Sequence, residues 1–173
     1  MQQISEQFTL DQTDYLILAQ LQNDASLTNQ QLAERVFTSP PTCLRRVKRL
    51  KDAGLIERQI AILSVDKLAP LIGHGITAII EVTLDRQDAQ SLEAFEERIT
   101  GDEALQQCYR VSPGPDFVLI VFAHDMPAYL ALSQRLFSAD ANVRNVKAFF
   151  SVKRGKFEPG IELPQSGAGS IGK

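Results

Sequence analysis

The sequence predicts an α+β protein with two domains, because the hydrophobic pattern changes along the chain. In the first third, apolar residues recur at helical spacing in three short segments, and the third also carries five basic residues. Beyond residue 73, strand-like alternation and helical spacing follow the order β-α-β-β-α-β. We therefore expect a helical domain in 1–55, a hinge strand and linker in 56–72, a sheet domain in 73–154 and a flexible tail in 155–173.

Composition narrows the class of protein. With 173 residues, 44% of them hydrophobic, the chain can bury a core, and its net charge of −3 gives no general attraction to a polyanion. Cys43 and Cys108 are too few for a disulfide framework or a four-ligand zinc site. No P-loop or metal-ligand cluster stands out either, and we expect neither a metal nor a bound cofactor. The sequence shows no signal-peptide pattern and no apolar run of about 18 residues. We expect a cytoplasmic, nucleoid-associated protein without a membrane partner.

Two helices are predicted before the basic segment. Residues 10–22 have apolar residues at helical spacing behind Asp11, which can cap the helix. Residues 28–36 begin with Thr28 and Gln31, the spacing of a capping box in which each side chain satisfies the other's backbone N–H. A short connection, Phe37 and Thr38, leads into the third helix.

The third helix, residues 39–52, combines an apolar stripe with basic residues. Ser39 can accept a hydrogen bond at the helix start, Pro40 suits the first helical position, and Gly54 can end the helix. The apolar sector contains Cys43, Leu44, Val47 and Leu50. The basic residues are Arg45, Arg46, Lys48, Arg49 and Lys51, with no acid from residue 40 to 51, so the local charge is +5. Three helices with a basic third helix indicate a helix-turn-helix.

The rest of the chain is predicted to form one further strand and then the sheet domain. Residues 56–65 alternate like a strand, and residues 70–75 supply a break at the domain boundary. Strands at 76–84, 105–111, 116–123 and 143–153, with helices at 88–100 and after Asp125, predict a ferredoxin-like βαββαβ sandwich. The strand at 116–123 is apolar nearly throughout and is expected to be covered on both faces. Ile79 and Phe149 lie on the sheet face away from the helices, which predicts a homodimer or higher assembly.

Five segments carry a resemblance to a known family. They are LDQTDYLILAQLQNDASLTNQQLAERV, SPPTCLRRVKRLKDAGLIER, VSPGPDFVLIV, DMPAYLAL and NVRNVKAFFSV. Over residues 10–155 the chain resembles the leucine-responsive/asparagine-responsive (Lrp/AsnC, or feast/famine) transcriptional regulators. The resemblance implies a winged helix-turn-helix that binds DNA, a hinge strand, and a C-terminal RAM domain that dimerises and binds a small effector, usually an amino acid. Octamers built from dimers are common in this family.

Two departures from the family pattern stand out. Phe37 and Thr38 replace the usual turn residues, often Gly followed by Leu, so we expect Phe37 to adopt a positive φ and to fill the core in place of that leucine. In the loop before residue 117, the usual Gly-Asp-x-Asp and aromatic pattern is replaced by Pro113, Gly114, Pro115, Asp116 and Phe117. The two prolines offer no N–H to a ligand carboxylate.

Site residues follow from these comparisons. We predict Arg45 and Arg49 at base edges, Arg46, Lys48 and Lys51 at phosphates, and Ser39, Pro41 and Thr42 near the DNA at the helix start. Two such helices about 34 Å apart on a dimer would read a palindromic operator in double-stranded DNA. The predicted effector residues are Ser112, Gly114, Asp116 and Phe117, with the Asp116 carboxylate accepting from the ammonium group of an amino acid.

Simpler interpretations compete with each of these. A charged helix can be only a solvated surface, and Asp116 can be only a turn residue. His74 and His124 are more typical of structural than of catalytic histidines, and Glu93, Glu96 and Glu97 of a solvated helix face. Because no nucleophile–base pair or P-loop stands out, we expect no enzyme. Two alternatives remain: a tetrapyrrole decarboxylase of the same architecture, using His124 and Arg110, or a ligand-independent architectural DNA-binding protein.

Overall fold

The computed structural model describes residues 8–164, which divide into two compact units. The N-terminal unit contains residues 8–62 and 157–164, and the C-terminal unit contains residues 63–156. Among the described residues, no helix has the length and apolar character needed to cross a membrane.

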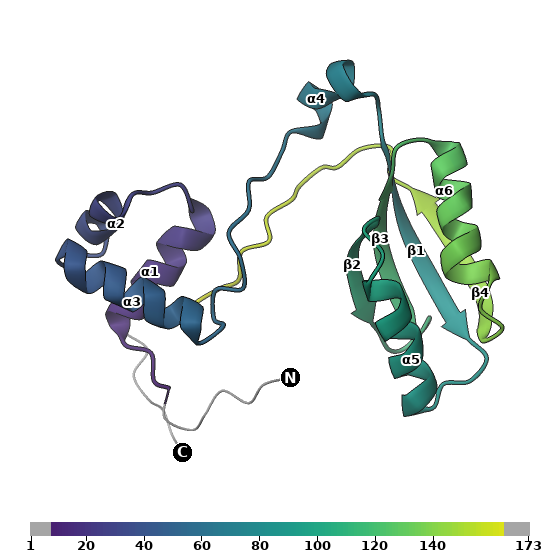
Figure 1. The fold of residues 1–173 in the computed structure, drawn as a ribbon, viewed down its shortest axis with the longest axis horizontal. Coiled ribbons are helices and arrows are strands. Elements are labelled where there is room, and N and C mark those ends of the chain that lie inside the picture. The colour runs from purple at the N-terminus through teal and green to yellow at the C-terminus, as the bar shows by residue number, and fades with distance from the viewer. Residues whose placement is uncertain (1–7, 165–173) are drawn as a thin grey trace. The chain divides into compact units, whose positions relative to one another are not determined.

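Three helices form the N-terminal unit (Figure 1): α1 (Gln12–Asn23), α2 (Asn29–Arg35) and α3 (Pro40–Asp52). Both predicted caps are confirmed. The backbone N–H of Asp14 donates to the Asp11 carboxylate at 3.0 Å, and the backbone N–H of Asp11 donates to the Asp14 carboxylate at 3.1 Å. Thr28 and Gln31 form the second capping box, with bonds of 2.9 and 3.2 Å. These local bonds fix where α1 and α2 begin.

The ends of α3 are only partly as predicted. The helix starts at Pro40, but the Ser39 side chain makes no capping bond to the backbone; its hydroxyl donates to the Thr42 hydroxyl instead, at 2.8 Å. At the other end Gly54 has a φ of 72° and donates to the Lys51 carbonyl, and Leu55 donates to the Leu50 carbonyl. This pair of bonds is the Schellman motif, which confirms Gly54 as the end of the helix.

The core of the N-terminal unit is small and contains one carboxylate. Its buried apolar residues are Ile17, Leu32, Ala33, Val36, Cys43 and Leu50, and Asp14 is buried with no exposed surface. Leu44, predicted in the apolar sector, is instead 60% exposed, because the buried side of α3 is narrower than the sequence pattern indicates.

The predicted strand at 56–65 is wrong. Residues 57–64 form no helix or strand, since no described segment offers them a hydrogen-bonding partner. A short helix, α4 (Val65–Ile72), follows and includes Pro70, so the break lies at Gly73, with its φ of 87°, inside the predicted range 70–75. Because proline has no N–H, Pro70 removes one backbone hydrogen bond from α4. It lies near the end of the helix, where few further hydrogen bonds are affected.

The C-terminal unit confirms the predicted βαββαβ order. Its elements are β1 (Ile76–Leu84), α5 (Ala89–Thr100), β2 (Leu105–Arg110), β3 (Phe117–Ala123), α6 (Met126–Ser133), the π-helical turn η1 (Gln134–Ser138) and β4 (Val143–Phe150). The strands form one antiparallel sheet in the order β2-β3-β1-β4. Asp125 caps α6, as predicted, and Asp88 caps α5.

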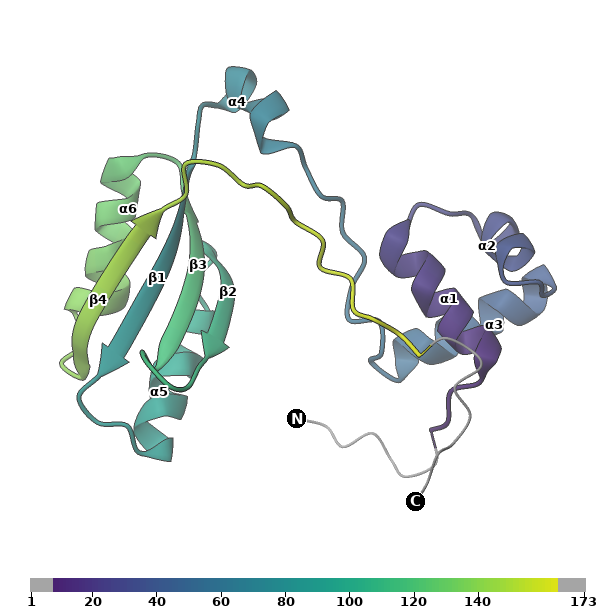
Figure 2. The same ribbon diagram turned by 180° about the vertical axis from the view of Figure 1, so that it is seen from behind.

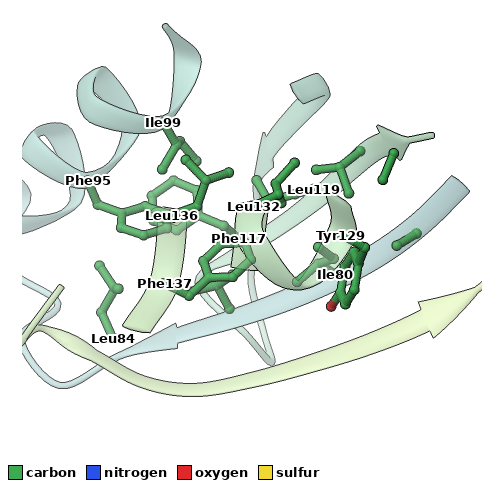
Figure 3. Close-up of a cluster of buried hydrophobic side chains, with 14 residues drawn as sticks. Ile80, Leu84, Phe95, Ile99, Phe117, Leu119, Tyr129, Leu132, Leu136 and Phe137 are labelled. Carbon is green, nitrogen blue, oxygen red and sulfur yellow. The ribbon is translucent and has the colours of Figure 1, made fainter. Parts of the chain in front are cut away.

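Both helices cover the same face of this sheet, and their contact with it forms the main core (Figure 3). On β1, Ala78, Ile80, Val82 and Leu84 are buried beneath them, and the rings of Phe95 and Phe117 lie 4.8 Å apart. Strand β3 is fully buried on this face and partly buried on the other, so coverage of both its faces, for which a second copy is expected, stays a prediction. Figure 2 shows the other face of the sheet, which neither helix covers.

The segment after β4 is not free along its described length. The Gln22 side-chain amide donates to the Ile161 carbonyl at 3.0 Å and accepts from the Ile161 N–H at 3.1 Å. This two-point pairing joins residues 157–164 to α1 and differs from the flexible tail predicted from residue 155. Residues 165–173 of that predicted tail lie outside the described part of the chain.

Candidate nucleic-acid interface and effector loop

A cluster of ion pairs joins α1 to α3 in the N-terminal unit. The buried Asp14 carboxylate accepts hydrogen bonds from the guanidinium groups of Arg46, at 2.9 Å, and of Arg49. Arg46 also donates to the Asp11 carboxylate at 2.7 Å, and the Arg49 guanidinium lies 4.9 Å from the centre of the Phe8 ring. Asp14 therefore has the paired, hydrogen-bonded environment that a buried carboxylate needs. We call Asp11, Asp14, Arg46 and Arg49 the ion-pair cluster.

Within the cluster, each partner stabilises the other's charge. The hydrogen bond from Arg46 holds the pKa of the Asp11 carboxyl below its usual value, and the bond to Asp11 raises the pKa of Arg46. Both arginines are thus occupied on the α1 side of the helix, whereas the sequence predicts Arg49 at base edges and Arg46 at a phosphate. The cluster fixes how α3 lies on α1.

The opposite side of α3 is open to solvent. Pro41, Leu44, Arg45 and Lys48 are all exposed, and their spacing of three, four and seven residues places them on one helix face. We call these four residues the outer stripe. No ion pair involving Arg45 or Lys48 occurs among the described residues. The outer stripe is therefore the part of α3 whose cations are available to phosphates and bases.

The remaining predicted DNA-binding residues lie at the two ends of α3. Ser39 is exposed and Thr42 half-buried, with their hydroxyls bonded to each other. Lys51 is exposed, and its ammonium group donates to the Gln59 side chain at 2.8 Å, a solvent-exposed bond that a phosphate can replace. The side-chain amide of Asn29, on α2, donates to the Pro40 carbonyl at 2.8 Å and holds the start of α3 against α2.

The turn between α2 and α3 contains Phe37 in an unusual conformation. Its φ is 54°, as predicted, but its side chain is 92% exposed. The prediction that Phe37 fills the core is therefore wrong. At a positive φ the Cα–Cβ bond leaves the chain in a direction that takes the ring away from Val36 and the core behind it.

In the C-terminal unit, the loop before β3 holds the predicted effector residues. The Asp116 carboxylate accepts from the backbone N–H of Leu84 at 2.7 Å and from the Gln87 side chain at 3.2 Å, with both bonds on the same oxygen. Asp116 thus ties the β3 loop to the end of β1, which supports the turn-residue interpretation. Its other carboxylate oxygen makes no hydrogen bond among the described residues.

The other three predicted effector residues do not share one environment. Ser112 and Gly114 are exposed, whereas Phe117 is fully buried against Phe95 on the helix-covered face. Phe117 is a core residue rather than part of an open surface. The structure therefore brings Ser112, Gly114 and Asp116 together on one loop and leaves Phe117 beneath it.

A cleft of about 740 Å³ opens elsewhere, between α5 and the 139–142 segment. One of its lining cations is already paired: Arg98 donates to Asp140 at 2.6 Å and to the Leu136 carbonyl at 2.9 Å. It includes none of the predicted effector residues.

Residues 8–164 contain no group of three His, Cys, Asp or Glu side chains placed to hold a metal ion. Arg110, a candidate for the decarboxylase alternative, is ion-paired with Glu96 at 2.5 Å.

Comparison with known proteins agrees with this division into two functional parts. Residues 10–57 match a winged helix-turn-helix DNA-binding family, and residues 77–161 match the Lrp/AsnC ligand-binding domain. An HTH-type transcriptional regulator of Haemophilus influenzae is 34% identical over 155 residues, 90% of each chain. The chain belongs to the Lrp/AsnC family of transcriptional regulators.

Other Lrp/AsnC proteins match over nearly the whole chain. The leucine-responsive regulatory protein of Rhizobium meliloti is 32% identical over 154 residues, covering 89% of this chain and 96% of that one. A Neisseria meningitidis transcriptional regulator, solved as a complex with L-Met, has 32% identity and a TM-score of 0.76, and the match covers 90% of this chain and 97% of the other.

Two features of this Lrp/AsnC chain were missed from its sequence. The role of Asp14 as the buried partner of two arginines is signalled only by its spacing from Asp11, which also suits a simple capping box. The outward position of Leu44 is not signalled at all, because a leucine beside Cys43 fits the apolar sector equally well. In addition, no strand that could form a wing occurs between residues 8 and 64.

Proposed function

We propose that this Lrp/AsnC regulator binds a palindromic operator as a dimer or an assembly of dimers, with one outer stripe in each half-site. The observation that carries the proposal is that α3 presents Arg45 and Lys48 without an ion-pair partner among residues 8–164, on a helix held in place by the ion-pair cluster. An arginine side chain that is not ion-paired can read guanine edges, and a lysine side chain that is not ion-paired can neutralise phosphates. Binding should therefore be both sequence-selective and strongly salt-dependent.

A gel shift with the DNA upstream of the chain's own gene tests this proposal. Arg45→Ala should weaken operator binding about 10-fold or more and reduce the preference over unrelated DNA, the cost of one bidentate base contact. Lys48→Ala should weaken binding to all DNA similarly and lower the salt slope by about one unit. Equal effects of the two variants would contradict the assignment, and failure of the wild type to bind any DNA at low salt would overturn the proposed function.

The uncovered sheet face supports the dimer. It exposes Ile79 and Phe149, which pair with each other across β1 and β4, and Tyr109 on β2. An apolar surface of this kind on a soluble regulator is covered most simply by a second copy. Phe149→Glu should shift the chain toward monomer in sedimentation velocity, whereas Leu130→Glu, on an exposed position of α6, should not. An octamer requires further contacts, which the same measurement detects in the wild type.

We further propose that the effector is an amino acid bound near Ser112, Gly114 and Asp116. The support is the match to the Lrp/AsnC ligand-binding domain, the L-Met in the Neisseria meningitidis relative, and the Asp116 carboxylate oxygen that has no hydrogen bond within residues 8–164. That oxygen can accept from an ammonium group. Because Pro113 and Pro115 have no N–H, the ligand carboxylate would have to find its donors elsewhere.

Calorimetry against the twenty amino acids, beginning with L-methionine, tests the effector. A bound amino acid should change operator affinity by roughly 5- to 150-fold, the usual range of coupling between two sites. Ser112→Ala should weaken binding without the structural cost that Asp116→Asn would bring, since Asp116 also holds the end of β1. A flat response to all twenty, with DNA binding intact, would favour the ligand-independent architectural role.

The decarboxylase alternative has little support. Arg110 is occupied by Glu96, and the matched relatives are named as regulators. Turnover of a tetrapyrrole together with absence of DNA binding would restore it.

A further inference from the structure

The outer stripe contains apolar groups as well as cations. Leu44 is 60% exposed and lies on the same helix face as Arg45 and Lys48. It belongs to neither hydrophobic cluster of the described residues, so its side chain gains no burial within the chain. A leucine here contributes nothing evident to folding, although it stands among the residues best placed to meet DNA.

Phe37 is a second apolar group at the same end of the module. It precedes α3 by three residues and is 92% exposed with a φ of 54°. A non-glycine residue in this conformation is strained. The Phe37 ring belongs to neither hydrophobic cluster of the described residues, so burial of the ring does not offset the strain. An exposed, strained aromatic residue beside a DNA-reading helix points to a contact with another molecule.

Double-stranded DNA offers one apolar group of the matching kind. In the major groove, thymine presents a 5-methyl group, which side chains read by apolar contact, and the N-terminal part of a recognition helix approaches the base edges there. The neighbouring cations Arg45 and Lys48 would favour a polyanion over an apolar protein surface as the occupant of this face.

We propose that Leu44 and Phe37 are specificity-determining residues that contact thymine 5-methyl groups in each half-site. The inference rests on the proposed DNA-binding function and adds the kind of base that the apolar part of the face selects. Arg45 would read hydrogen-bonding edges, and the two apolar residues would read methyl groups that no hydrogen bond can distinguish.

The test replaces single thymines by deoxyuracil, which removes the methyl group and leaves base pairing unchanged. Operators are first selected with the full wild-type chain from a pool of random duplexes, and each thymine of one half-site is then replaced in turn. For the wild type we expect two positions at which uracil weakens binding by about fourfold, the value of one buried methyl group. Leu44→Ala should abolish the effect at one position and Phe37→Ala at the other.

Two controls separate recognition from folding. Leu130→Ala removes a leucine that is also 60% exposed on a helix, but in the C-terminal unit, and it should keep both uracil-sensitive positions. Phe37→Ala keeps a Cβ at the same φ, so it removes the ring and retains the strain. Binding to unrelated DNA at low salt should be nearly unchanged in both test variants.

The possible outcomes are distinct. Selective binding with no uracil-sensitive position overturns the inference and leaves the proposed function standing. A sensitive position that persists in both variants also overturns it. Absence of any enriched sequence, together with no binding at low salt, is instead the failure of the proposed function.

Discussion

The interiors of the two units of this chain differ in whether they contain a charged group. In the N-terminal unit the carboxylate of Asp14 lies fully buried beside a small apolar cluster and pairs with Arg46 and Arg49. In the C-terminal unit the buried cluster is larger and contains no charged residue within the described part of the chain. The surfaces differ in the same sense, because the outer stripe presents cations and the uncovered sheet face presents Ile79 and Phe149.

The difference shows how each unit divides its side chains between folding and binding. A three-helix unit has little apolar area to hold its third helix, so ion pairs fix the position of α3 at the expense of two arginines that DNA could have used. Such pairs specify geometry more reliably than they add stability. The sheet unit has further apolar residues on its second face, and these form the proposed dimer interface.

The largest expected effect comes from breaking the ion-pair cluster. Asp14→Asn would leave Arg46 and Arg49 without their buried counter-charge and should lower the free energy of unfolding of the N-terminal unit by about 3 kcal/mol. Hydrogen exchange measured by mass spectrometry on peptides from residues 8–62 would show the loss, while peptides from the sheet should keep their protection.

Glu96→Gln is the matched control for that variant. Its pair with Arg110 is also between a carboxylate and a guanidinium, but the two side chains are 42% and 41% exposed. Exposed pairs contribute at most about 1 kcal/mol. If both variants cost the same, the buried position of Asp14 would have no special importance.

A second comparison uses neighbouring residues on β1. Ile80 is fully buried under the helices and Ile79 is 39% exposed on the other face. Ile80→Ala should lower the free energy of unfolding by about 3 kcal/mol, and Ile79→Ala by less than about 1 kcal/mol in the monomer. Denaturation at rising protein concentration would widen the effect of Ile79→Ala if this face is the dimer interface. An effect independent of concentration would argue against that interface.

The sequence predicted most elements whose signals are local. Capping residues such as Asp11, Thr28 and Asp125 act on the next turn of the chain, so their partners are visible in the sequence. The alternation on β1 and β3 likewise shows directly which face meets the helices. These signals also suffice for the ferredoxin-like order of elements.

Predictions failed where a partner distant in sequence decides the outcome. Residues 57–64 alternate like a strand but find no strand to pair with. Arg49 is separated from Asp14 by 35 residues, and no helical periodicity indicates that an arginine will turn toward another helix. For Asp116 the ligand role stays a prediction, and what the sequence does not show is its bond to the Leu84 N–H, 32 residues away.

Replacing Phe37 should change the free energy of unfolding by a smaller amount and in the opposite direction. Phe37→Gly removes the strain of a positive φ without removing any buried contact, so it should raise the free energy of unfolding of the N-terminal unit by about 1 kcal/mol. Phe37→Ala should show no such gain, because it retains a Cβ at the same φ. Thermal unfolding of both variants checks this, and an equal gain in both would place the cost in the exposed ring rather than in the backbone.

The smallest expected effect is on how the stability of the N-terminal unit falls at acidic pH. Since the bond from Arg46 lowers the pKa of Asp11 in the folded state, the unfolded chain binds more protons at this residue as the pH falls. The contribution of Asp11 to stability is therefore complete above about pH 4 and is lost as the pH falls through its lowered folded-state pKa. Asp11→Asn should flatten the acid side of the stability profile of the N-terminal unit and leave that of the sheet unchanged. Asp24, whose pKa is lowered by its bond from Ser26, provides the control. Asp24→Asn should also flatten the profile but leave α3 docked on α1, which hydrogen exchange in α3 would distinguish.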